Sequence, residues 1–349
     1  MLIQAVYWNG IFNAILDFPL AQNLDKQLSN SLTILVCARN ENENLGKLIP
    51  QLLDQEGKVQ ILIVNDQSSD NSEMFLQNIC DKHENIDFIN SSKEIHGKKL
   101  ALMEGFESVT NDFILLTDAD CRVPKTWSMQ MESAAEDKDI VLGFSPYQKA
   151  TGFLNKWIRY EAIITAIQYL SFAIIGRPYM GVGRNILYKK HLIKDGSILK
   201  EHLNIPGGDD DLLINKLATA ENVTVNIHPD SWVYSTPLTS WKAYINQKRR
   251  HHSTSWYYKT KDKLALGIFS GTWVGFYLVV FYLILSGYIL QGLSLFLLRF
   301  LFTLVPNIKL MNKLDGKDLA RYWVIFDPLT SLYFLFFSLF MLLPKRKQW

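Results

Sequence analysis

Short apolar runs alternate with segments of helical periodicity along residues 31–262. Apolar runs typical of buried strands cover residues 32–37, 60–64, 86–90, 113–118 and 139–144. Between several of these runs, apolar side chains recur at helical spacing over residues 42–53, 73–82 and 97–109. Strands that alternate with helices in this order predict an α/β fold built on a mainly parallel, doubly wound sheet.

The pattern changes after residue 263, where the chain becomes largely apolar. Three segments, about 264–285, 288–305 and 323–343, are candidates to cross a membrane, because a spanning helix needs roughly 20 apolar residues. The second segment carries Arg299, and a charge at mid-membrane costs at least about 2.5 kcal/mol. Aromatic residues near the segment ends and flanking basic residues favour membrane helices over a soluble bundle. We therefore expect two to three transmembrane helices.

The remaining segments complete a three-part division of the chain. Residues 1–30 are predicted to form an interfacial or anchor segment and a linker, residues 31–262 the α/β domain, and residues 263–349 the membrane domain. Residues 153–174 predict a long amphipathic or interfacial helix. Three crossings would place the basic residues 345–347 on the side opposite the α/β domain, against the positive-inside tendency. A lost N-terminal anchor or a re-entrant segment would resolve this conflict.

Composition adds little beyond the placement of charge. The net charge is +2, but basic residues gather next to the apolar segments, as expected of a membrane protein, and we expect no nucleic-acid partner. The three cysteines have no metal-ligand spacing, and because their number is odd they cannot all pair in disulfides. This cysteine usage favours a reducing compartment.

The run over residues 113–118 delivers two carboxylates, Asp118 and Asp120, to the end of a predicted strand. Side chains two residues apart on an extended chain point the same way, so both can approach one divalent cation. The carboxyl edge of a parallel sheet is also where α/β folds bind nucleotides. A solvated acidic turn is the alternative for this pair taken alone.

Four further groups have both a chemical and a structural interpretation. Asp66 follows the strand over 60–64 and suits a base edge or ribose, or simply a turn. Lys98 opens a helix, where a diphosphate or only solvent would fit. The three carboxylates at 209–211 either complement a helix dipole or include a general base. The basic run 247–252 either binds anionic lipid headgroups or approaches a diphosphate or acceptor.

Taken in chain order, these groups resemble the motifs of inverting nucleotide-sugar glycosyltransferases of family two, which have the GT-A fold. The resemblance is to membrane-associated bacterial members and covers about residues 31–260. It is carried by six short motifs: Cys37–Glu41, Val64–Asp70, Gly97-Lys98, Asp118-Ala119-Asp120, Gly208–Asp210 and Gln247-x-x-Arg250.

The resemblance implies a role for each matching residue. Ala38 and Glu41 would line the nucleotide pocket, Asp66 would bind a uracil-type base, Lys98 and Asp118 would contact the donor, and Asp120 would ligate Mg²⁺ or Mn²⁺. Asp210 matches the acidic residue that deprotonates the acceptor hydroxyl, and Gln247 and Arg250 match a donor-binding motif that normally ends in Trp. Two positions depart from the family: His251 stands in place of that Trp, and Asn65 stands where many relatives have a second Asp.

The implied activity is metal-dependent transfer of a sugar, with inversion, from a nucleotide-sugar, in the first place a UDP-sugar. The acceptor would be a hydroxyl of a lipid-linked molecule or glycolipid. The protein would be multi-pass in a bacterial inner membrane, with its catalytic domain cytoplasmic. Three alternatives remain at this stage: a processive polysaccharide synthase, a polyprenyl-phosphate glycosyltransferase, and a scaffold that binds nucleotide-sugar without turnover.

Overall fold

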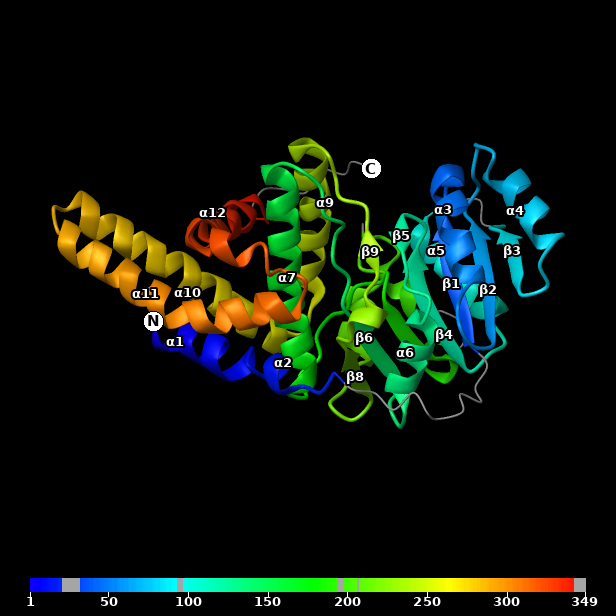
Figure 1. Ribbon diagram of the computed structural model, residues 1–349, viewed down its shortest axis with the longest axis horizontal. Helices are drawn as coiled ribbons and strands as arrows, with labels where there is room; N and C mark the ends of the chain where they lie inside the picture. The colour runs from blue at the N-terminus through cyan, green and yellow to red at the C-terminus, as the bar shows by residue number, and fades with distance from the viewer. Residues whose placement is uncertain (21–31, 93–96, 194–196, 206, 342–349) are drawn as a thin grey trace. The chain divides into compact units, whose positions relative to one another are not determined.

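The computed structural model describes residues 1–20, 32–92, 97–193, 197–205 and 207–341 (Figure 1). The predicted linker over 21–30 and the basic residues 345–347 lie outside the described residues. The chain divides into two compact units. The sheet unit contains Pro19–Gln148 and Gly176–Pro237, and the helical unit contains Met1–Phe18, Lys149–Ile175 and Leu238–Trp349.

A seven-stranded sheet in the order β3-β2-β1-β4-β7-β6-β8 forms the centre of the sheet unit within the described residues. Its strands are β1 Leu32–Ala38, β2 Val59–Asn65, β3 Ile86–Asn90, β4 Phe113–Asp118, β6 Ile140–Gly143, β7 Ile186–Lys189 and β8 Val223–Asn226. All pairs are parallel except those of β7, which runs antiparallel to both neighbours. A second, two-stranded sheet joins β5 Cys121–Arg122 to β9 Tyr234–Ser235. The predicted mainly parallel α/β fold is confirmed.

Among the described residues, the sheet unit also contains five helices, three of which fall where the sequence predicts helices, at 42–53, 73–82 and 97–109. They are α3 Asn42–Leu53, α4 Ser72–Cys80, α5 Lys98–Ser108, α6 Trp127–Ala135 and α8 Asp211–Leu217, with short 3₁₀ turns η2 Lys190–Leu192, η3 Ser197–His202 and η4 Pro229–Ser231. Leu45, Leu48 and Leu52 of α3 are fully buried in the same core as alternate residues of β1. On α5, a Cβ at Gly105 would lie 2.7 Å from Leu35 Cδ1, so glycine permits the close approach of helix to sheet.

The helical unit is built around three long apolar helices, α10 Thr260–Leu285, α11 Ile289–Lys313 and α12 Trp323–Met341 (Figure 1). Each contains a stretch long and apolar enough to cross a membrane. The other elements are α1 Leu2–Ala5, the π-helix η1 Val6–Ile11, α2 Ala14–Asp17, α7 Phe153–Ile174, α9 Trp241–Thr254, η5 Ser255–Tyr257 and η6 Ala320–Tyr322. Trp8 of η1 is fully buried and packs edge-on against Trp273 and Trp323, so the N-terminal segment belongs to this helical core.

Arg299, the charge that made the second apolar segment doubtful, has a partner inside the helical unit. Its Nε lies 2.7 Å from Asp327 Oδ2, and its Nη2 lies 3.0 Å from Asp327 Oδ1. Both side chains are almost fully buried, and Tyr277 donates a further hydrogen bond to Asp327. Because a bidentate pair neutralises the charge, Arg299 can be accommodated within the apolar stretch of α11.

Candidate active site

The predicted site residues of the first half of the chain meet at one edge of the sheet. The parallel register pairs Cys37 of β1 with Val64 of β2 and with Asp118 of β4. Strands in this register end together, so Ala38, Asp66 and Asp118 all lie at the carboxyl edge. The three buried apolar strands therefore bring the polar residues at their carboxyl ends to the same edge of the sheet.

Lys98, at the first position of α5, joins this edge to the carboxylates near α8. Its Nζ lies 2.7 Å from Asp118 Oδ1 and 3.1 Å from Asp209 Oδ2. Burial alone would lower the pKa of Lys98, but Asp118 and Asp209 outweigh that effect and raise it well above its usual value. In return, and against the effect of burial, Lys98 holds the pKa of Asp209 below its usual range. These residues and Asp210 line one small pocket.

Asp210 is the N-cap of α8 and accepts two backbone hydrogen bonds. Its Oδ1 accepts from Asp211 N at 2.8 Å, and its Oδ2 accepts from Gly183 N at 2.7 Å. A Cβ on Gly183 would lie 2.9 Å from Asp210 Cβ, so the approach needs glycine. Burial, reinforced by the charges of Asp209 and Asp211, raises the pKa of Asp210 to about 7. A carboxylate with this pKa can accept a proton efficiently near neutral pH.

Asp118 and Asp120 provide a donor set that fits a divalent cation. They and Cys121 each offer one ligand atom, and the three atoms lie within 4.8 Å of one another. Burial raises the pKa of the Cys121 thiol to about 12, which keeps it protonated at neutral pH. Because Mg²⁺ and Mn²⁺ prefer oxygen ligands, the two carboxylates are the ligands that suit them.

Asp66 has a buried oxygen that is ready to accept a hydrogen bond. The side chain is 5% exposed, and its Oδ2 accepts from Gly97 N at 3.0 Å. Its Oδ1 is buried and has no hydrogen-bond partner among the described residues. An unsatisfied buried acceptor is costly, and a base N–H or ribose hydroxyl would satisfy it. The preceding Asn65 instead donates to Asn90 Oδ1 at 2.7 Å, so its amide joins β2 to β3.

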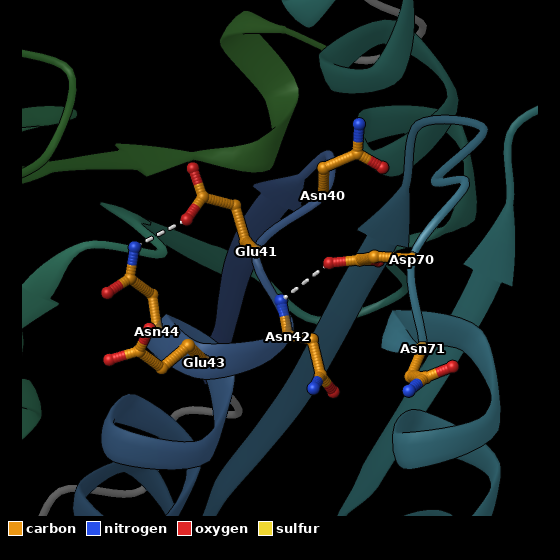
Figure 2. A pocket seen from close by; sticks show the side chains of 7 residues that line it. All are labelled: Asn40, Glu41, Asn42, Glu43, Asn44, Asp70 and Asn71. Carbon is orange, nitrogen blue, oxygen red and sulfur yellow. Dashed lines mark hydrogen bonds between the residues drawn. The ribbon is translucent and has the colours of Figure 1, made fainter.

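Glu41 lies in an open, polar pocket of about 350 Å³ at the end of β1 (Figure 2). The pocket is lined by Asn40, Glu41, Asn42, Glu43, Asn44, Asp70 and Asn71. Figure 2 shows the Glu41 carboxylate turned toward Asn44, which donates to its Oε2 at 2.5 Å. Burial raises the pKa of Glu41, and the negative charges of Asp120 and Asp118 raise it further. Glu41 therefore interacts electrostatically with the two carboxylates at the end of β4.

Gln247 and Arg250 lie in the other unit, on α9, where Ser240 caps the helix by accepting from Ala243 N at 3.3 Å. Arg250 and His251 have exposed side chains, and Gln247 is half-buried. The role of this motif in donor binding stays a prediction.

The sequence analysis missed Arg184, which immediately follows Gly183. Its Nη2 donates to Ser145 O at 3.0 Å, and its guanidinium carbon lies 4.9 Å from the centre of the Tyr147 ring. The only signal in the sequence is the polar run Gly183-Arg184-Asn185 before the three-residue apolar stretch 186–188. A run that short does not predict a strand by itself.

Comparisons with known proteins identify similar sequences and a similar fold. Residues 33–196 match the family model described as Glycosyl transferase family 2. The Undecaprenyl-phosphate 4-deoxy-4-formamido-L-arabinose transferase of Proteus mirabilis is 28% identical over 121 residues, which are 33% of this chain and 36% of that protein. The 4,4'-diaponeurosporenoate glycosyltransferase of Staphylococcus haemolyticus is 27% identical over 94 residues, which are 27% of this chain and 25% of that protein. The chain thus matches little more than a third of the first relative's length and a quarter of the second's.

A solved structure has the same fold over nearly the whole chain. It is the mannosyltransferase PcManGT from Pyrobaculum calidifontis in complex with GDP-Man and Mn²⁺, which superposes with a TM-score of 0.55 at 16% identity. The superposition covers 94% of this chain and 93% of that one.

Proposed function

We propose that this chain, whose residues 33–196 match the Glycosyl transferase family 2 model, belongs to that family and transfers a sugar from a nucleotide-sugar to a hydroxyl of a lipid-linked acceptor. The transfer inverts the anomeric carbon and takes place at the cytoplasmic face of a bacterial inner membrane. The three long apolar helices would hold the enzyme there.

One observation carries the proposal: Asp118, Lys98 and Asp210 line the same pocket at the carboxyl edge of the sheet. A cation-binding carboxylate, a cationic side chain and a carboxylate of raised pKa are the groups that this reaction needs. A binding scaffold has no need of a base with a pKa near 7.

The mechanism follows from the position of each group. Asp66 accepts a hydrogen bond from the base or ribose through its unsatisfied Oδ1, and Glu41 lines the neighbouring pocket. Lys98 exchanges its carboxylate partners for the donor diphosphate. A divalent cation held by Asp118 and Asp120 would supply positive charge to the leaving nucleoside diphosphate.

Asp210 performs the proton transfer. It removes the proton from the acceptor hydroxyl as the oxygen bonds to the anomeric carbon and the bond to the diphosphate breaks on the opposite side. The backbone N–H groups of Gly183 and Asp211 fix the orientation of its carboxylate during this step.

The nature of the acceptor separates the main proposal from its alternative. One relative's name includes undecaprenyl phosphate, and the other's is a diaponeurosporenoate glycosyltransferase, so each is named for a lipid. A phosphate acceptor is already an anion and needs no base, whereas a hydroxyl does. The raised pKa of Asp210 therefore favours a hydroxyl over a polyprenyl phosphate.

A panel of nucleotide-sugars tests this function with the full-length protein in detergent. UDP- and GDP-sugars are compared by thermal stabilisation and by slow donor hydrolysis, with Mn²⁺ or Mg²⁺ added. We expect one nucleotide class, in the first place uridine, to stabilise the protein and to be hydrolysed. Failure of every nucleotide-sugar to bind would refute the proposal, and binding without turnover would favour a scaffold.

A further inference from the structure

The turn before β7 brings a positively charged residue, Arg184, to the carboxyl edge of the sheet. Strand β7 runs antiparallel to β4, and Leu116 pairs with Ile186. The residues just before β7 form a turn, in which Asn185 N donates to Val182 O at 2.9 Å. Gly183 of this turn lines the same pocket as Asp118, at the edge where the donor is proposed to bind, and Arg184 is the next residue. Arg184 therefore enters the site from the segment before β7, which the motifs of the nucleotide pocket do not include.

Two contacts hold the guanidinium of Arg184 in place, and they leave some of its N–H groups available for further hydrogen bonds. Ser145 O accepts from Nη2 at 3.0 Å, and the Tyr147 ring lies against the plane. The Nε is buried and has no partner among the described residues. A guanidinium carries five N–H donors in a rigid fork, so these contacts use only part of it.

The positive charge of Arg184 interacts with the carboxylates of Asp118 and Asp120, but Arg184 forms no contact ion pair with either of them. Burial alone would lower the pKa of Arg184, but nearby negative charge, including that of Asp118 and Asp120, keeps it above its usual value. Within the described ranges, however, no carboxylate oxygen lies within 4.0 Å of the guanidinium, whereas Lys98 contacts Asp118 directly. A half-buried cation that is held by Ser145 and Tyr147 and lacks a contact ion pair is suited to an anionic ligand.

We propose that Arg184 binds the diphosphate of the donor and stabilises the departing nucleoside diphosphate. The inference rests on the proposed function and adds a residue to its site. A planar guanidinium fits two phosphate oxygens at once, and its effect grows as negative charge develops on the leaving group. Together, Lys98 and Arg184 would supply positive charge from α5 and from the segment before β7.

Binding measurements on the full-length protein in detergent test this role. Isothermal titration compares UDP or GDP, whichever base the donor panel selects, with the corresponding nucleoside, each in Mn²⁺ and in EDTA. The variants are Arg184→Met, which removes the charge, and Arg184→Lys, which keeps it without the fork. Arg177→Met is the matched control, because Arg177 belongs to the same incoming segment and is exposed.

We expect Arg184→Met to weaken binding of the nucleoside diphosphate about 10–100-fold, the usual range for loss of a hydrogen bond to a charged group. The loss should persist in EDTA, nucleoside binding should not change, Arg184→Lys should be intermediate and Arg177→Met should resemble the wild type. Equal diphosphate affinity in wild type and Arg184→Met would overturn the inference, as would a parallel loss of nucleoside binding, which indicates a purely structural role. Absence of nucleotide binding in the wild type would instead refute the proposed function itself.

Discussion

Replacement of Asp210 by Asn is the sharpest test of the chemistry, because it removes a proton acceptor with almost no change in size. In the structure, both carboxylate oxygens accept backbone N–H groups. An Asn amide has one acceptor oxygen, so the variant loses one of these two bonds. That loss costs about 1–3 kcal/mol of local stability.

The catalytic effect should be larger than this structural one. Loss of a general base slows transfer about 10²–10⁴-fold, which corresponds to roughly 3–5 kcal/mol in the barrier. Donor affinity should stay near that of the wild type, since the proposed mechanism assigns Asp210 to the acceptor hydroxyl and not to the base, the ribose or the diphosphate. Asp211→Asn is the matched control: Asp211 Oδ1 accepts from Leu212 N at 2.8 Å in the first turn of α8. A carboxylate in that position is worth about 0.3–1 kcal/mol to the helix.

The pH dependence gives a second readout. Because burial and like charges raise the pKa of Asp210 to about 7, the base is ionised above that pH and protonated below it. Turnover of the wild type should therefore fall as the pH drops from 8 to 6, and the residual rate of Asp210→Asn should lack this step. The assay is transfer kinetics across that range, with nucleotide-sugar binding and melting temperature measured for both variants.

Two results would contradict the reasoning. If Asp211→Asn is inactive and Asp210→Asn active, the wrong carboxylate has been assigned. If neither substitution matters, the acceptor is already an anion, and the polyprenyl-phosphate alternative replaces the hydroxyl acceptor.

Three further predictions concern the metal, the membrane and the buried ion pair. Asp120→Ala should abolish Mn²⁺- or Mg²⁺-dependent turnover while the protein still inserts and folds; undiminished metal-dependent activity would exclude Asp120 as a ligand. The full-length protein should stay in the membrane after high-salt and carbonate washes, because salt does not screen hydrophobic insertion, and release by salt alone would contradict a spanning role for the apolar helices. Asp327→Asn should destabilise the helical unit by about 3–5 kcal/mol because it leaves Arg299 buried without a counter-charge. In thermal unfolding, the double variant with Arg299→Met should recover much of that loss. An unchanged melting temperature for Asp327→Asn would argue against a buried ion pair.

The parts of the site that could be predicted are those that follow from local pattern. The apolar run before Asp118 reads as a buried strand, and the structure has β4 there. Because parallel strands end at a common edge, the sequence also places Asp66 near Asp118. Each of these inferences needs only residues close to one another in the chain.

The parts that could not be predicted depend on pairing between distant segments. Strand β7 is four residues long, and nothing in its composition specifies an antiparallel position between β4 and β6. Arg184 could not be assigned to the site without that position. In the same way, the partner of Arg299 lies on another helix, so the sequence showed an unfavourable charge and not the ion pair that neutralises it. Likewise, the sequence shows only that Asn65 stands where many relatives have an Asp. The structure shows that the Asn65 amide donates a hydrogen bond to Asn90.

The three adjacent carboxylates at 209–211 show how backbone placement gives identical side chains different roles. Asp209 lies against Lys98 and remains ionised as its counter-charge. Asp211 is buried in the first turn of α8, where its side chain bonds to the helix backbone. Asp210 accepts a hydrogen bond from Gly183 N, and burial together with the negative charges of Asp209 and Asp211 raises its pKa. Spacing alone cannot separate three such residues, whereas their separate backbone environments leave Asp210 as the carboxylate suited to accept a proton.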